Sequence, residues 1–130
     1  MAVERQGVKG LVNAMLFASR PLGGAPRNLR GSLPRKGFKP LVAAILKRHA
    51  AIAESFHCGL GHRLSFLESR LLIDILGRLE AESIIGLPLH DSVLVPVSNA
   101  ERVKTIMEQA FRDHFGGLQA PVDIKRTERD

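Results

Sequence analysis

The spacing of apolar residues along the chain predicts four amphipathic helices. Apolar side chains recur three or four positions apart, which places them on one face of an α-helix. The segments with this spacing are residues 4–19, 40–58, 62–83 and 98–115. The third segment has the longest apolar stripe, which we expect to be buried, and its members are Leu64, Leu67, Leu71, Leu72, Ile75, Leu76 and Leu79.

Residues at the ends of these segments support the assignment. Pro40 suits the first turn of a helix, because a backbone N–H at that position has no intrahelical partner to lose. Ser98 and Glu101 match a capping box at the start of the last helix, and Gly116 with Gly117 would end that helix. Ordinary start and stop signals therefore bound the predicted helices.

Two short apolar runs predict a β-hairpin. Residues 84–89 and 93–97 are rich in β-branched side chains, and three polar residues separate them. A last strand is expected over about residues 120–125. Three helices followed by a hairpin, a helix and a strand predict an α+β fold, with the helices packed on a small antiparallel sheet.

A basic segment, residues 20–38, lies between the first two helices. It contains three Pro and four Gly, which predict a loop. Residues 1–48 hold ten Lys or Arg and a single acidic residue, whereas the rest of the chain carries a net charge of −3. A solvated surface is one explanation, but such asymmetry also suits contact with nucleic-acid phosphates. The candidate phosphate contacts are Arg20, Arg27, Arg30, Arg35, Lys36 and Lys39.

The length and cysteine content limit the number of domains and the compartment in which the protein is expected. A chain of 130 residues predicts a single domain with one core. Cys58 is the only cysteine, so no intramolecular disulfide forms, and a reducing cytoplasm is the expected compartment. No apolar run approaches eighteen residues, so we expect no membrane span. His57, Cys58 and His62 lack a fourth zinc ligand, and Cys58 is expected to be a small packed residue.

The predicted hairpin carries the strongest candidate chemistry. His90, Asp91 and Ser92 lie at its turn, where the Asp91 carboxylate can project from the end of the sheet. Asp is also common in turns for a structural reason, because its side chain bonds nearby backbone N–H groups. The residues alone leave both interpretations open.

An apolar strand, His-Asp-Ser, a second apolar strand and a following helix together resemble motif C of nucleic-acid polymerases. The sequence is similar to the single-subunit phage-type RNA polymerases, and family A DNA polymerases usually have His-Asp-Glu at this place. The resemblance implies that Asp91 binds catalytic Mg²⁺ and that His90 lies beside the primer end, with Ser92 completing the motif.

A second resemblance lies upstream. Family A polymerases carry Arg-x3-Lys-x7-Tyr-Gly on the fingers helix, and this chain has Arg5, Lys9, Phe17 and Ala18 at the same spacing. On an α-helix Arg5, Lys9 and Phe17 fall within about a third of the circumference. The resemblance implies that Arg5 and Lys9 bind nucleotide phosphates and that Phe17 stacks near the sugar and base. Phe17 lacks the tyrosine hydroxyl and Ala18 replaces Gly, which puts sugar discrimination in doubt.

The polymerase resemblance is incomplete in one respect. Polymerase chemistry uses two metal ions, normally held by carboxylates from separate strands, and the first strand would precede Arg5, where we expect no room for it. The resemblance therefore implies a polymerase fragment or subunit of phage or plasmid origin, inactive alone and completed by a second chain or by self-association. A non-enzymatic nucleic-acid-binding accessory protein and a small structural protein are the alternatives.

Overall fold

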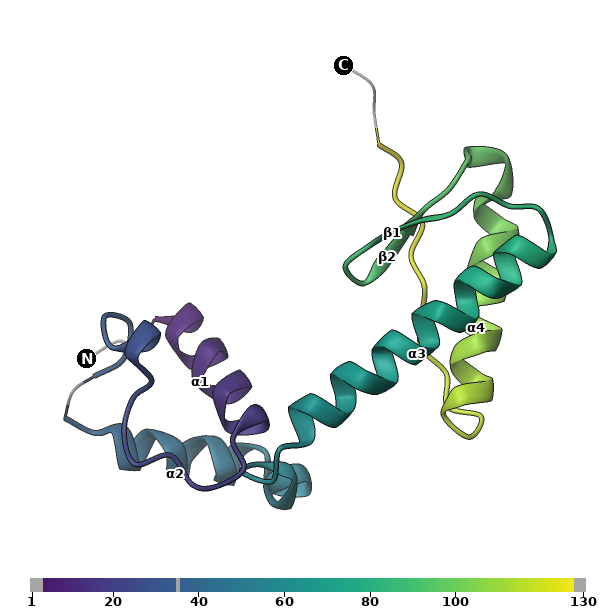
Figure 1. Cartoon of the computed structure of the whole chain (residues 1–130). Helices are drawn as coiled ribbons and strands as arrows, with labels where there is room; N and C mark the ends of the chain where they lie inside the picture. The colour runs from purple at the N-terminus through teal and green to yellow at the C-terminus, as the bar shows by residue number, and fades with distance from the viewer. Residues whose placement is uncertain (1–3, 35, 128–130) are drawn as a thin grey trace. The chain divides into compact units, whose positions relative to one another are not determined.

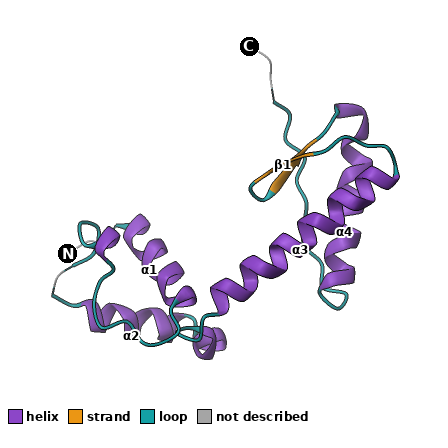
Figure 2. Ribbon diagram, in the orientation of Figure 1, coloured by secondary structure: helices purple, strands orange, loops and turns teal. Residues whose placement is uncertain are grey.

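The structure, a computed structural model, describes residues 4–34 and 36–127 and divides the chain into two compact units (Figure 1). The first unit lies within residues 1–66 and the second within residues 67–130. The elements, with η for a 3-10 helix, are α1 (Arg5–Phe17), η1 (Arg27–Leu29), α2 (Phe38–Arg48), η2 (Ala50–Ser55), α3 (Leu60–Ala81), β1 (Leu87–Leu89), β2 (Ser92–Leu94), η3 (Val97–Asn99) and α4 (Ala100–His114). Helices with a two-stranded antiparallel sheet confirm the α+β fold (Figure 2).

The first unit is built around one face of α1. Leu11 and Met15 lie four residues apart, so they occupy the same side of the helix, and neither is exposed to solvent. The other buried members of this cluster come from α2 and from the segments on either side of it, and they are Leu33, Phe38, Ile45 and Phe56.

The predicted basic loop is anchored on this first core. Among its described residues before Phe38, the loop contains no strand and no helix longer than the short η1. Leu33 is buried, and Leu22, Ala25 and Leu29 pack against the cluster. These apolar side chains fix the course of a segment whose Pro and Gly content predicts only a loop.

Two glycines of α1 allow the loop to lie close to the helix. A Cβ added at Gly7 would lie 2.3 Å from the carbonyl oxygen of Ser32, and one added at Gly10 would lie 2.6 Å from Cδ2 of Leu29. Both distances are shorter than any van der Waals contact, so a side chain at either position would have to displace its neighbour. Gly7 meets backbone rather than a movable side chain, which makes it the stricter of the two.

The second unit packs the end of α3 against α4. Ile75 and Leu79 of α3 are buried, and α4 contributes the apolar face that its sequence predicts. The other buried members of this cluster are Ile84, Val103, Ile106 and Ala110. Val93 and Val95 of the hairpin pack against the same cluster, so one face of the small sheet covers the helix pair.

Each unit has its own cluster of buried side chains, where the length of the chain predicts one core. The physical reason lies in the loop, because its apolar side chains give α1 and α2 enough partners to form a separate cluster. The predicted apolar stripe of α3 is correspondingly less buried than expected. Ile75 and Leu79 are buried, whereas Leu64 is 46% exposed.

Two further details of the prediction are wrong. Residues 118–127 form no strand, and among the described residues the sheet contains only β1 and β2. Pro121 lacks the backbone N–H that a sheet ladder needs. Ser98 does not cap α4, because its hydroxyl donates to Oδ1 of Asn99 at 2.9 Å instead of to a backbone N–H.

Both long helices of the second unit end in the same motif. The N–H of Gly117 donates to the carbonyl of Arg112 at 2.9 Å beyond the end of α4, which confirms the predicted glycine stop. At the end of α3 the N–H of Ile84 donates to the carbonyl of Leu79, also at 2.9 Å, and Ser83 takes the left-handed position with φ of 56°. A serine therefore occupies a position that favours glycine.

We expect Ser83→Gly to raise the free energy of unfolding of the second unit by about 1 kcal/mol, because glycine adopts this backbone conformation without a Cβ clash. Urea denaturation followed by circular dichroism measures the change. Ser83→Ala is the matched control, since alanine keeps the Cβ and should leave stability nearly unchanged. Equal stability of the Gly and Ala variants would contradict the argument.

Candidate functional site

The hairpin of the second unit places His90 and Asp91 at its tip. Leu87 pairs with Leu94 and Leu89 with Ser92, so a two-residue turn joins the strands. Such turns need a positive φ, and His90 provides it with φ of 53°.

Ser92 has a structural partner in this turn. Its hydroxyl donates to the carbonyl oxygen of Leu89 at 2.8 Å, so a side-chain hydrogen bond also links the two ends of the turn. The structure thus brings together the three sequence-predicted residues His90, Asp91 and Ser92 in one exposed turn. Of the three, Ser92 makes the contact that holds the turn.

The Asp91 carboxylate is exposed at this tip. Within the described part of the chain, no hydrogen bond or ion pair engages it, and no group of three or more His, Cys, Asp or Glu side chains could hold a metal ion. A divalent ion at Asp91 would therefore need most of its ligands from water, a substrate or another chain.

Other carboxylates of the second unit form ion pairs within α3 and between α4 and the C-terminal part of α3 or the residue that follows it. Arg78 contacts Asp74 and Asp113, in each case through Nη2 at 2.9 Å. His114 Nε2 lies 3.1 Å from Oδ2 of Asp74, and Gln109 donates to Asp113 at 2.8 Å. Arg102 likewise pairs with Glu82.

These contacts hold the carboxylates in their charged form. The hydrogen bond from Arg78 lowers the pKa of Asp74, against a smaller opposing effect of burial. Gln109 and then Arg78 lower the pKa of Asp113, and the hydrogen bond from Arg102 lowers the pKa of Glu82. These acids hold the two helices together, which distinguishes them from Asp91.

The nucleotide-binding candidates of α1 lie in the first unit, and Asp91 lies in the second. Arg5 and Lys9 are exposed on α1. Lys9 also lines a shallow groove on that helix, together with polar and small residues, and the other lining residues are Gln6, Gly10, Val12, Asn13 and Leu16. Arg5 is not part of the lining.

Phe17 is used for packing at the end of α1. Its ring lies edge-on to the ring of His62, with centroids 5.0 Å apart, and a Cβ added at Gly61 would lie 2.5 Å from Cδ2 of Phe17. Gly61 therefore leaves the space that this ring fills. The half-buried ring already has partners on α3, which limits its ability to stack on a nucleotide.

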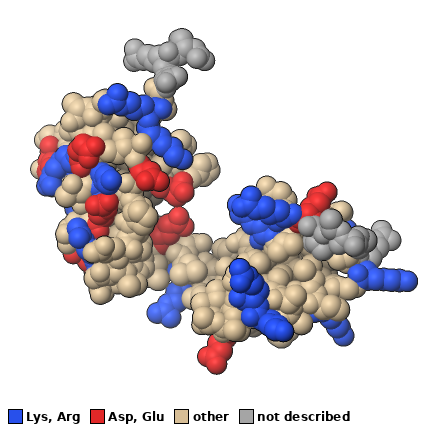
Figure 3. All heavy atoms as spheres, turned by 180° about the vertical axis from the view of Figure 1, so that it is seen from behind, with Lys and Arg blue, Asp and Glu red and all other residues tan. Residues whose placement is uncertain are grey.

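The basic side chains of the first unit remain on its surface. Arg20, Arg27, Arg30, Lys36 and Lys39 are all exposed, and Arg35 lies outside the described residues. Figure 3 shows mainly Lys and Arg among the charged groups on one face of the first unit, whereas acidic and basic groups mix on the second.

The structure corrects the expectation for Cys58. Its side chain is exposed, and its Sγ lies 3.1 Å from the carbonyl oxygen of Ser55, to which it donates. The backbone N–H groups on either side of Cys58 hold this turn at the end of α1, because His57 donates to the carbonyl of Met15 and Gly59 donates to the carbonyl of Ala18.

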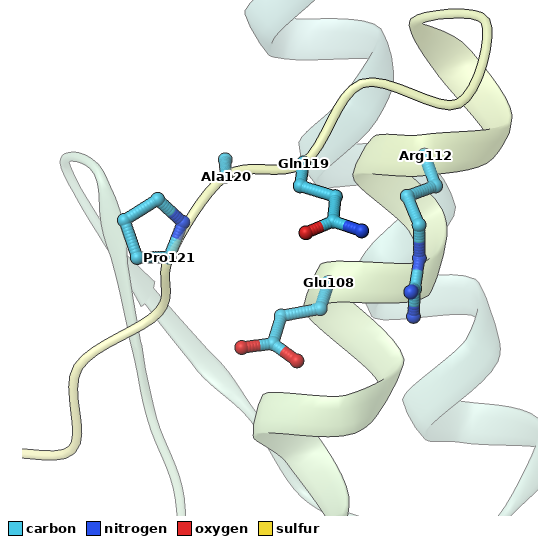
Figure 4. A pocket seen from close by; sticks show the side chains of 5 residues that line it. All are labelled: Glu108, Arg112, Gln119, Ala120 and Pro121. Carbon is cyan, nitrogen blue, oxygen red and sulfur yellow. The ribbon is translucent and has the colours of Figure 1, made fainter.

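A cavity in the second unit was not foreseen from the sequence. It has a volume of about 230 Å³ and lies between α4 and the segment that follows it (Figure 4). Glu108 and Arg112 line it from α4, and Gln119, Ala120 and Pro121 face them from the following segment. The glycine turn after α4 brings this segment back along the helix, and that reversal could have been read from Gly116 and Gly117.

In the part of the chain that the structure describes, no helix is both long enough and apolar enough to span a membrane.

Comparisons with protein-family models, with curated proteins and with solved structures give no match to this chain.

Proposed function

We propose that this chain is a palm-like fragment or subunit of a nucleic-acid polymerase and that Asp91 supplies one carboxylate of its Mg²⁺ site. One observation carries the proposal. The Asp91 carboxylate is exposed at the two-residue tip of a hairpin between α3 and α4, which is the order of elements around motif C in the polymerases that the sequence resembles.

The contrast between Asp91 and its neighbours supports this role. Asp74, Asp113 and Glu82 have cationic partners, so their charges serve the packing of α3 on α4. Mg²⁺ is commonly bound by one or two carboxylates together with substrate phosphates and water. An exposed and unengaged Asp91 fits one half of such a site.

The same proposal gives roles to the other matched residues. Arg5 and Lys9 are exposed cations on one helix, and they would bind the phosphates of a nucleoside triphosphate. His90 would contact the primer end beside Asp91. Phe17 would support this helix through its contact with His62, with stacking on the sugar and base only if the ring moves.

The chain would act with a partner. Two-metal catalysis requires ions about 3.5–4 Å apart, held between separate carboxylates, and a second chain or a second copy would supply the missing one. The single Cys58 supports a reducing compartment, and we place the protein in the cytoplasm.

A non-enzymatic role is the second candidate, and the surface of the first unit favours it. The described residues 4–34 and 36–66 have ten exposed or accessible Lys and Arg against two Glu, and the five described candidate phosphate contacts are all exposed. This surface would bind phosphates of a nucleic acid without contribution from Asp91.

The paramagnetic ion Mn²⁺ tests the role of Asp91. With a nucleoside triphosphate present, we expect Mn²⁺ to broaden the amide NMR signals of residues 90–92 and Asp91→Asn to abolish this broadening. Asp123→Asn is the matched control, because Asp123 is another exposed acid of the second unit. Equal broadening around Asp91 and Asp123 would identify the hairpin as a structural turn.

The same samples test for autonomous catalysis. The isolated chain should incorporate no nucleotide with Mg²⁺ or Mn²⁺, because one carboxylate cannot position both ions. Template-dependent extension that Asp91→Asn abolishes would overturn the need for a partner.

A further inference from the structure

Apolar anchors and cations alternate along the basic loop of the first unit. Leu22 and Leu29 pack against the core of this unit. Arg20, Arg27 and Arg30 are exposed, and each lies one or two positions from one of these anchors. The loop therefore turns its leucines toward the core while its arginines remain in solvent.

The course of the loop is fixed most closely around Leu29. The N–H of Leu29 donates to the carbonyl of Pro26 at 2.9 Å, and its own carbonyl accepts from the N–H of Ser32 at 3.0 Å. Gly10 of α1 leaves the space for the Leu29 side chain, because a Cβ added there would lie 2.6 Å from Cδ2 of Leu29. Folding thus orders the segment that carries the two nearest arginines, and a ligand need not order it again.

The cations of this unit have no competing partners within the protein. Among residues 4–34 and 36–66, no ion pair engages a Lys or Arg, and the only acids are Glu4 and Glu54. Figure 3 shows mainly Lys and Arg among the charged groups on one face of this unit. The positive charge is therefore available to an anionic partner.

The aromatic residues restrict the kind of nucleic acid that suits this surface. Proteins that bind single strands commonly stack the bases on aromatic rings, and this chain contains no Trp and no Tyr. In the first unit Phe38 and Phe56 are buried in the core, and Phe17 packs on His62. Phe66 is 61% exposed but lies on α3, outside the basic loop. The loop surface thus offers cations without a stacking ring.

We propose that the docked loop binds the phosphate backbone of a double-stranded nucleic acid in preference to a single strand. A duplex holds its phosphates in fixed positions, with one negative charge per about 1.7 Å of helix axis. A set of cations that folding has already positioned matches such a rigid array. A single strand presents no fixed array, and its bases find no ring on the loop. The inference rests on the second candidate function and names the class of its ligand.

Fluorescence anisotropy with the full chain tests the preference. The two probes are labelled oligo-dT of about 20 nucleotides, a length that exceeds most single-strand site sizes, and the same strand annealed to oligo-dA. At equal NaCl concentration we expect the duplex to bind about tenfold more tightly, because the preorganised cations need less ordering. For six contacts the salt slope should be about −5.4 for the duplex and about −4.2 for the single strand. Equal affinity, or tighter binding of oligo-dT, would overturn the inference.

A substitution that leaves the charge unchanged tests the docking of the loop. Leu29→Ala removes one anchor and should weaken duplex binding about tenfold, because the segment with Arg27 and Arg30 then has to be ordered on binding. The affinity for oligo-dT should change less. Leu118→Ala is the matched control, since Leu118 is 65% exposed in the second unit. Hydrogen exchange of the α1 amides shows that the first unit of the variant is folded, and unchanged duplex affinity in that folded variant would refute the role of docking.

Failure of this inference differs from failure of the candidate function on which it rests. If duplex and single strand bind equally and both lose affinity with salt, the nucleic-acid role stands and the duplex preference is wrong. If neither probe binds at 50 mM NaCl, a condition at which phosphate contacts are strong, both the role and the preference are wrong. Neither result depends on Asp91, so the polymerase proposal is tested separately.

Discussion

Affinity of the chain for single-stranded oligo-dT should fall about 300-fold between 50 and 200 mM NaCl. Each phosphate neutralised by Lys or Arg releases condensed counterions, and about six such contacts would produce a loss of this size. The five exposed candidate contacts, Arg20, Arg27, Arg30, Lys36 and Lys39, together with Arg35, match this number. Fluorescence anisotropy at several salt concentrations gives the slope directly.

Substitution of three loop cations tests where those contacts lie. Arg27→Gln, Arg30→Gln and Lys36→Gln together should reduce the salt slope by about two, because each lost contact on a single strand removes about 0.7 unit. The matched control replaces the exposed Arg70, Lys125 and Arg126 of the second unit and removes the same charge. If both triple variants reduce the slope equally, net charge and not the loop determines binding.

The substitution Gly7→Ala should destabilise the first unit by about 2 kcal/mol. In the middle of a helix, alanine is ordinarily more stable than glycine by about 1 kcal/mol, so the sign depends on the surroundings. The new Cβ would lie 2.3 Å from the Ser32 carbonyl oxygen and 3.0 Å from its carbonyl carbon. Overpacking costs about 1–3 kcal/mol, and the obstacle here is backbone that side-chain rotation cannot relieve.

Hydrogen exchange of the α1 amides measures this loss within the first unit. Gly23→Ala is the matched control, because no atom lies within 4 Å of a Cβ added there. We expect that variant to be as stable as the original chain or slightly more so. Unchanged or slower exchange in Gly7→Ala would mean that the loop has moved away from α1, and the close contact would be refuted.

The helices and the hairpin were predictable because their signals are local. Leu11 and Met15 lie on the same helix face whatever the tertiary arrangement. The apolar runs on either side of residues 90–92 likewise predict two strands and a turn without information from the rest of the chain. The expected strand at residues 120–125 is absent because a strand depends on a non-local partner. A strand needs a neighbour with free backbone groups, and Pro121 lies beside α4 instead.

The candidate site was predictable only in part. The motif at His90 and Asp91 is continuous in sequence, so its place on an exposed turn followed from the hairpin. The pairing of Arg78 with Asp74 follows helical spacing, but its contact with Asp113 depends on how α3 packs on α4. Gly116 and Gly117 indicate the chain reversal after α4, but residue types alone do not show where the following segment lies against Arg112.

The hairpin register determines which edge of the sheet can accept another strand. Leu89 and Ser92 flank a two-residue turn and form a hydrogen-bonded pair, so the next pair, Pro88 and Val93, directs its backbone groups outward. Pro88 has no N–H to offer, and the outer edge of β1 is closed to regular pairing. Val93 retains both groups, so a strand from a second chain would extend the sheet alongside β2.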